Sequence, residues 1–87
     1  MNPKKLKLIR RLNIIEGQIR GLREMIDKDK YCIDIITQSS AVKQGLSSVE
    51  DILMEEHLSD CTIKQIKSGN SKKAIGEIIE VYKLKRK

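Results

Sequence analysis

Apolar side chains recur every three or four positions from residue 9 to residue 26, which is the spacing of one face of an α-helix. The sequence therefore predicts an amphipathic helix of about 25 residues, in which Asn2 caps the N-terminus and Pro3 takes the first helical position. The residues of its apolar stripe are Ile9, Leu12, Ile15, Ile19, Leu22 and Ile26.

Residues 27–31 (DKDKY) interrupt the stripe, and Asp29 is predicted to cap a second helix. The same spacing then resumes and continues without proline to His57 and Cys61, so we expect one long helix. The alternative is a loop at Gly45 and the serines around it, which would give a four-helix monomer. The apolar stripe favours the continuous helix. Its positions up to residue 53 are Cys32, Ile35, Ser39, Val42, Leu46, Val49 and Leu53.

A second interruption at residues 67–71 (KSGNS) predicts that Gly69 ends the long helix and that Asn70 or Ser71 caps a short third helix. The expected fold class is therefore all-α, with two long helices and one short helix in a single domain, residues 1–87. The apolar stripes also indicate that these helices pack against partner helices. The residues predicted on the inner face of the third helix are Ile75, Ile78, Ile79 and Tyr82.

Composition agrees with an all-α chain that has an aliphatic core. The 87 residues include no Trp or Phe, two Tyr and one Pro, and a core of this size gains stability from oligomerisation. No apolar run suits a signal peptide or a transmembrane helix, so we expect a cytoplasmic protein. In that compartment cysteines serve metal binding or catalysis more often than structural disulfides.

The net charge of +6 is unevenly distributed along the chain. Residues 1–30 carry nine basic and four acidic side chains, residues 31–60 carry one and six, and residues 61–87 carry eight and two. Two basic ends around an acidic middle favour a polyanionic partner, and nucleic acid rather than a membrane surface. The alternative is a solvated chain that simply uses many lysines.

The only histidine, His57, lies four residues before Cys61, so one helical face carries both side chains. Taken alone, such a pair is more often a packing accident than a metal site. Cys32 lies about 38 Å before His57 along a continuous helix, so one chain could not bring all three side chains to one ion. An antiparallel second copy of the helix could.

The middle of the long helix suits such a crossing. If two copies cross about a two-fold axis, residue 32 of one faces residues 57–61 of the other, and each dimer holds two identical sites. The crossing point then falls at residues 45–46, where small side chains let two backbones approach closely. These small residues are Ser39, Ser40, Ala41, Gly45, Ser47 and Ser48.

The donor types favour one metal. Two thiolates and one imidazole form a soft set that suits Cu(I), which accepts three ligands, better than structural zinc, which requires a fourth. The chain has no further histidine to offer Ni(II) or Co(II).

Three segments of the sequence resemble the copper-sensitive operon repressor (CsoR) family, whose wider group includes nickel/cobalt, formaldehyde and persulfide sensors. They are residues 10–26 (RRLNIIEGQIRGLREMI), 31–42 (YCIDIITQSSAV) and 57–61 (HLSDC). The resemblance covers essentially the whole chain. It implies a three-helix protomer, an antiparallel four-helix-bundle dimer and a homotetramer built as a dimer of dimers. It also implies a transcriptional repressor, not an enzyme, that binds operator DNA without a helix-turn-helix.

At the matching positions, the resemblance implies that Cys32, His57 and Cys61 hold one Cu(I) per protomer. It further implies that Tyr31 and Glu77 contact this ligand set and transmit its occupancy. Nickel/cobalt sensors use additional histidines, persulfide sensors lack the histidine, and formaldehyde sensors lack the second cysteine, so copper is the expected inducer. Cu(I) binding would then weaken the affinity of the protein for operator double-stranded DNA.

For DNA contact we expect a basic face on the first helix, continued by one lysine of the second helix, with the C-terminal KLKRK as a secondary candidate. Two other functions are considered. One is a thiol or persulfide sensor that uses the Cys32–Cys61 pair, and the other is a metal-storage or copper-chaperone protein without a DNA role. The residues expected to contact DNA are Lys4, Lys7, Arg10, Arg11, Gln18 and Lys43.

Overall fold

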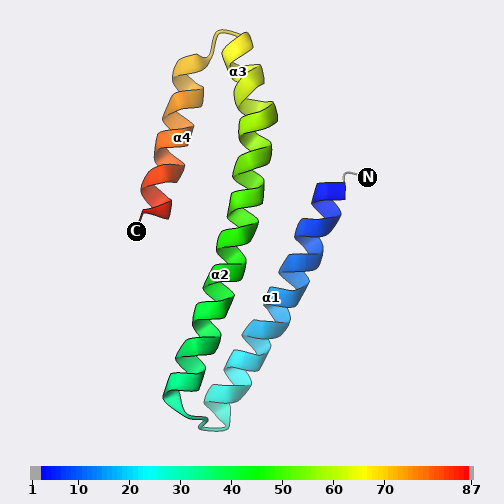
Figure 1. Cartoon of the computed structure of the whole chain (residues 1–87), viewed down its shortest axis with the longest axis vertical. Helices are drawn as coiled ribbons and strands as arrows, with labels where there is room; N and C mark the ends of the chain where they lie inside the picture. Colours follow the sequence, from blue (N-terminus) through cyan, green and yellow to red (C-terminus); the bar gives the residue numbers. More distant parts are fainter. Residues whose placement is uncertain (1–2, 87) are drawn as a thin grey trace. The chain divides into compact units, whose positions relative to one another are not determined.

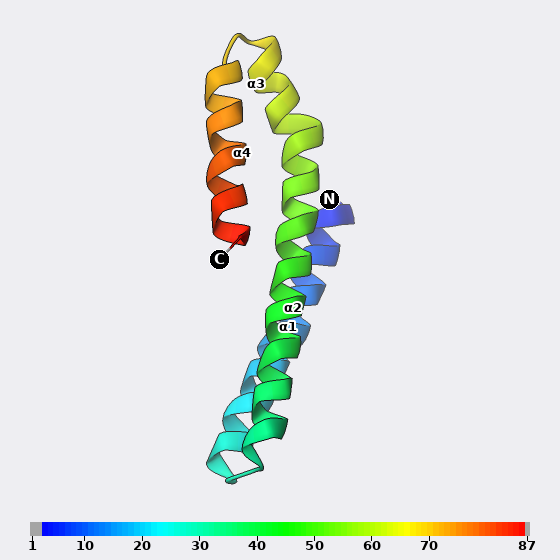
Figure 2. The same cartoon turned by 60° about the vertical axis from the view of Figure 1, so that its left-hand side comes forward.

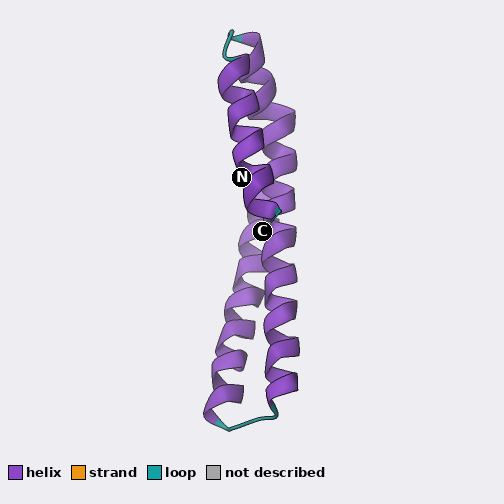
Figure 3. Ribbon diagram, turned by 90° about the vertical axis from the view of Figure 1, so that its left-hand side faces the viewer, coloured by secondary structure: helices purple, strands orange, loops and turns teal. Residues whose placement is uncertain are grey.

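The computed structural model of the chain describes residues 3–86, and all of its regular structure in that range is helical (Figure 1). Within residues 3–86, only residues 28–31, residues 68–70 and Arg86 lie outside helices (Figure 3). The elements are α1 (Pro3–Asp27), α2 (Cys32–Glu56), the π-helical segment η1 (His57–Thr62), α3 (Ile63–Lys67) and α4 (Ser71–Lys85).

Because α2, η1 and α3 follow one another without a break, the described chain has three helical runs: Pro3–Asp27, 32–67 and Ser71–Lys85. This confirms the predicted all-α, three-helix fold class. The alternative of a loop at Gly45 is wrong, since α2 continues through that residue. Asn2, the predicted first cap, and Lys87 of the basic tail lie outside the described residues.

The first connection differs from the prediction at Asp29. This residue has a left-handed backbone (φ 53°), its N–H donates to Ile26 O at 3.1 Å, and the Lys30 N–H donates to Met25 O at 2.9 Å. These two hydrogen bonds close the C-terminus of α1 as a Schellman motif. The next helix begins after Tyr31, whose carbonyl accepts its first hydrogen bonds. The prediction that Asp29 caps α2 is therefore wrong, because Asp tolerates the left-handed conformation that the end of α1 requires.

The second connection follows the prediction. Gly69 has φ 90°, its N–H donates to Ile66 O at 3.1 Å, and the Asn70 N–H donates to Gln65 O at 2.7 Å. The motif at the end of α1 recurs here with glycine in the left-handed position. Asn70 precedes α4, and its carbonyl accepts from the Ala74 N–H at 3.1 Å.

The chain divides into two compact units, one up to Ile52 and one from Leu53 on. In the first unit α1 lies antiparallel beside α2 (Figures 1 and 2). A methyl group at Gly45 would lie 3.3 Å from two side-chain carbons of Ile15, so the bare glycine permits this close contact between the helices. The buried core of the unit, with Ile52 packed against it, consists of Leu8, Ile15, Val42 and Val49.

In the second unit, α4 lies beside α3 and buries a face that the sequence did not predict (Figure 1). Ala74 is fully buried, and Ile78 and Val81 are half-buried. The prediction for the inner face holds only for Ile78. The predicted stripe and the buried one have the same helical spacing, and the buried one passes through the small Ala74. The other three residues predicted there are exposed: Ile75, Ile79 and Tyr82.

Many large apolar side chains of the single chain are exposed on α1 and α2, including most of the predicted stripes. Patches of this kind mark surfaces that contact a partner. Among the described residues, no helix is long and apolar enough to span a membrane. The exposed members of the predicted stripes are Ile9, Leu12, Ile19, Ile26, Leu46 and Leu53.

Candidate metal centre and basic face

The three predicted ligands lie on the helical run 32–67. Cys32 is the first residue of α2, His57 is the first residue of η1, and Cys61 lies in the same segment. Both cysteines are free thiols on the surface, while the His57 side chain is 29% exposed. Within residues 3–86, no three His, Cys, Asp or Glu side chains lie close enough to hold a metal ion together. The ligand set therefore stays a prediction that requires a second chain.

The helix that carries His57 and Cys61 changes its hydrogen-bonding pattern at this point. Six residues, His57–Thr62, form a π-helix between α2 and α3. π-helical turns are rare, and they occur frequently at functional sites. The sequence does not predict this segment, because the spacing of four from Leu53 through His57 to Cys61 suits an uninterrupted α-helix.

Glu77 of α4, which the family resemblance implies as a contact of the ligand set, lies beside His57. Glu77 Oε2 lies 3.9 Å from His57 Nε2, which is too long for a hydrogen bond. The other oxygen, Oε1, accepts a hydrogen bond from Gln65 Nε2 at 2.8 Å. Sequence reasoning missed Gln65, since a half-buried glutamine on a short helix carries no recognisable signal. Tyr31 directly precedes Cys32 and is exposed.

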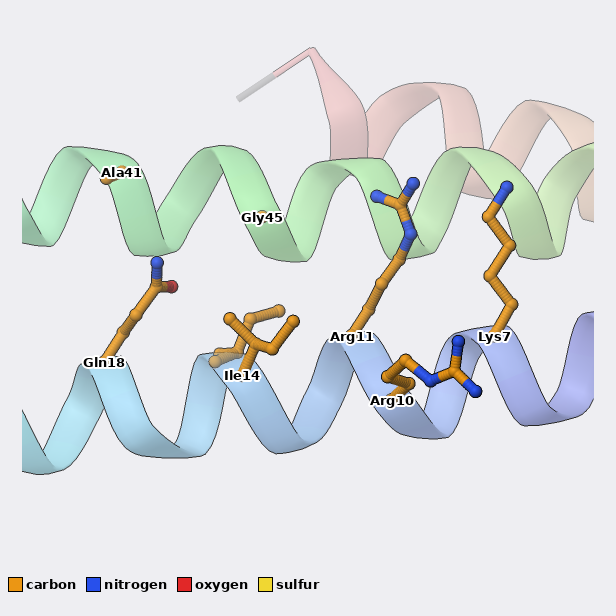
Figure 4. A pocket seen from close by; sticks show the side chains of 8 residues that line it. Lys7, Arg10, Arg11, Ile14, Gln18, Ala41 and Gly45 are labelled. Carbon is orange, nitrogen blue, oxygen red and sulfur yellow. The ribbon is translucent and has the colours of Figure 1, made fainter.

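Four of the six predicted DNA-contacting residues line one groove between α1 and α2, within the unit that ends at Ile52. The groove has a volume of about 440 Å³, and Lys7, Arg11 and Gln18 extend from α1 toward α2 (Figure 4). Arg10 also lines it, whereas Lys4 and Lys43 do not. None of the residues that line the groove is acidic. Its apolar lining residues are Ile14, Ile15, Ala41 and Gly45.

Three cations around an apolar floor, without a carboxylate among the lining residues, create a positive potential that attracts anions. Lys7, Arg11 and Gln18 share a face because their spacings of four and seven match the helical repeat. The amide of Gln18 adds a group that can both donate and accept hydrogen bonds, the type of side chain that reads base edges.

Comparison with known proteins gives one family. Residues 4–83 match the family model described as metal-sensitive transcriptional repressor. The copper-sensing transcriptional repressor CsoR of Bacillus subtilis (strain 168) is 41% identical over 82 residues, which cover 94% of this chain and 81% of that protein. The copper-sensing transcriptional repressor RicR of Mycobacterium tuberculosis (strain ATCC 25618 / H37Rv) is 50% identical over 60 residues, 69% of this chain and 62% of that one.

Two solved structures have the same fold. The copper-sensing repressor CsoR with Cu(I) from Geobacillus thermodenitrificans NG80-2 superposes with a TM-score of 0.89 and 34% identity, covering all of this chain and 92% of the other. The nickel-responsive transcriptional regulator InrS superposes with a TM-score of 0.75 and 29% identity, covering 90% of this chain and 88% of that one.

Proposed function

Because this chain belongs to the family of metal-sensitive transcriptional repressors, we propose that it is a Cu(I)-sensing repressor that binds operator DNA when metal-free and releases it when Cu(I) binds. Family membership confirms the resemblance noted in the sequence, and it confirms that the protein is a regulator and not an enzyme. It also argues against the alternative of a storage or chaperone protein.

The donor chemistry is the observation that carries the choice of copper. Cys32 and Cys61 are exposed free thiols, and His57 is the only imidazole that the chain can offer. Two sulfurs and one nitrogen suit Cu(I), whereas a nickel site would draw on more nitrogen ligands. The two curated relatives described above are named copper-sensing, and one solved structure contains Cu(I), in agreement with this choice. We propose one Cu(I) per protomer.

Each site would be built from two chains, with Cys32 of one protomer and His57 and Cys61 of its partner. The apolar residues exposed on α1 and α2 support an antiparallel four-helix-bundle dimer, with the tetramer as a dimer of dimers. Within this assembly the chain would act as a single domain in the cytoplasm.

The contact with Glu77 supports one orientation of His57 in this role. Its Nε2 faces Glu77 Oε2 at 3.9 Å, so Nδ1 is the nitrogen left to hold Cu(I). A metal-bound imidazole commonly donates its other N–H to a carboxylate. Shortening this contact to hydrogen-bond range, about 2.8 Å, would connect the ligand to α4. Tyr31, next to Cys32, is the second residue proposed to respond to occupancy.

The basic groove is the proposed DNA contact. Lys7, Arg10 and Arg11 would bind backbone phosphates, and Gln18 would lie close to the bases. Lys4, Lys43 and the C-terminal lysines and arginine would add phosphate contacts outside the groove. An exposed lysine or arginine that contacts one phosphate raises the affinity and makes it depend on salt, without adding sequence specificity.

Mixed dimers test the two-chain site. A dimer of one Cys32→Ala chain and one Cys61→Ala chain would keep one complete site, because the intact Cys32 faces the intact His57 and Cys61 of the other chain. Differently tagged chains, co-expressed and purified as heterodimers, should bind one tightly held Cu(I) per dimer, whereas either variant alone binds none. Heterodimers without tight binding would contradict the proposed site.

The second candidate function is a thiol or persulfide sensor, favoured by the exposure of both free thiols. It would use a sulfur link between Cys32 and Cys61 of neighbouring chains, with His57 only packing. The copper sensor needs the imidazole of His57 as a ligand, whereas the thiol sensor does not.

A further inference from the structure

The two carboxylate oxygens of Glu77 face different side chains in the unit from Leu53 on. Its Oε1 accepts a hydrogen bond from Gln65 Nε2 at 2.8 Å, while its Oε2 lies 3.9 Å from His57 Nε2. Gln65 belongs to α3, His57 to η1 and Glu77 to α4. The bond from Gln65 therefore fixes the direction in which the second oxygen points.

The orientation of the Gln65 amide follows from its partner. A carboxylate only accepts hydrogen bonds, so the atom that faces Glu77 must be the NH₂ group. The amide oxygen of Gln65 is then buried and has no hydrogen-bond partner among the described residues. An unpaired buried carbonyl destabilises a fold, and an apolar side chain of similar size would avoid this penalty.

The turn between α3 and α4 does not depend on this side chain. Gly69 N–H and Asn70 N–H close it with backbone hydrogen bonds to Ile66 O and Gln65 O, and Ala74 is fully buried at the start of α4. Packing and turn geometry therefore do not explain why position 65 carries a glutamine. The hydrogen bond from Gln65 to Glu77 explains the glutamine.

We propose that Gln65 is a positioning residue that holds the Glu77 carboxylate toward His57, and that it thereby sets how strongly metal binding is coupled to DNA release. The coupling part rests on the proposed function. The Glu77 side chain is 42% exposed, so without Gln65 its carboxylate would sample solvent-facing rotamers. Ordering it would then oppose formation of the bond from His57.

Four variants test the role: Gln65→Met, the isosteric Gln65→Glu, Glu77→Ala and the double variant Gln65→Met/Glu77→Ala. Gln44→Met, an exposed glutamine on α2, is the matched control. The metal-free protein is examined first by NMR, through the side-chain amide signal of Gln65 and the ring signals of His57. The Gln65 amide signal should shift in Glu77→Ala. The His57 ring signals should shift in both Gln65 variants and stay unchanged in the control.

The second measurement is the ratio of DNA affinities of metal-free and Cu(I)-loaded protein. Gln65→Met should bind Cu(I) with unchanged stoichiometry and unfold at no lower temperature than the wild type. Its affinity ratio should fall by about 2- to 30-fold, the range that corresponds to typical changes in allosteric coupling. The affinity ratio of Gln65→Glu should fall as well, because a second carboxylate repels Glu77. In the Glu77→Ala background, Gln65→Met should change the ratio no further.

Two results would overturn the proposal: unchanged His57 ring signals in both metal-free Gln65 variants, or an equal loss of coupling from Gln65→Met with and without Glu77. A wild type that keeps its DNA when loaded with Cu(I) would refute the proposed function instead. The ring signals of the metal-free protein would still decide whether Gln65 positions Glu77.

Discussion

Replacing Arg11 by Gln removes one of the three cations of the basic groove while it keeps a polar side chain of moderate length. If Arg11 contacts a DNA phosphate, the variant releases one counterion fewer for each copy of the chain that contacts DNA. The slope of log affinity against log salt concentration should therefore become shallower by about 0.9 per contacting copy.

The size of the effect can be worked out over a practical range of salt. Between 50 and 200 mM the salt concentration changes fourfold, so one phosphate contact accounts for a factor of about 3.5 in affinity per copy. The three cations Lys7, Arg10 and Arg11 together would account for about 40-fold per copy over the same range. The ratio of the DNA affinity of the wild type to that of Arg11→Gln should thus decrease as the salt concentration increases.

Fluorescence anisotropy with labelled operator DNA at four or five salt concentrations measures these slopes directly. Arg23→Gln, an exposed position on α1 outside the groove, is the matched control and should keep the slope of the wild type. The assignment of the groove would be refuted if Arg11→Gln kept the wild-type slope, or if Arg23→Gln lost as much slope as Arg11→Gln.

Other predictions concern the sensor and the fold. His57→Ala should abolish DNA release by Cu(I), since copper needs the imidazole, whereas retained regulation would favour the thiol sensor. Gly69→Ala should lower the free energy of unfolding in urea by about 1–2 kcal/mol, because φ is 90° there and a Cβ is strained in the left-handed region. Gly76→Ala, inside α4 with nothing within 4 Å of the added methyl group, should raise it by about 0.5–1 kcal/mol. Equal effects of the two glycine substitutions would contradict this account of the turn.

The helical runs were predictable because their apolar spacing is unbroken and the connections contain strong turn residues. Gly69 shows this well, since glycine is the common choice for a left-handed helix end. Asp29 was misassigned because an aspartate serves two purposes: it caps helix starts through its side chain, and it tolerates the left-handed backbone that closes α1.

The faces of the helices were harder to predict than their ends. On α4, a stripe through Ile75 and Ile79 has the same periodicity as the stripe through Ala74 and Ile78 that is buried. Hydrophobicity alone selects the larger side chains, whereas close packing of two helices selects the small Ala74. Where a helix carries apolar residues on two faces, packing against the neighbouring helix decides which face is buried.

The ligand types and Glu77 were accessible from the residue pattern and the family resemblance, but the groups around them were not. The π-helical turn at His57–Thr62 preserves the spacing of four that suggested an α-helix. The hydrogen bond from Gln65 to Glu77 joins residues twelve positions apart across a turn, and no sequence periodicity encodes such a contact.

The most direct test of the central claim is an anaerobic Cu(I) titration of the reduced protein against a competing chelator, with labelled operator DNA present. The account predicts one tightly held Cu(I) per protomer and release of DNA in step with filling of the sites. Sites that fill while the DNA stays bound would contradict it, and the inducer would then be sought in the sulfur chemistry of Cys32 and Cys61.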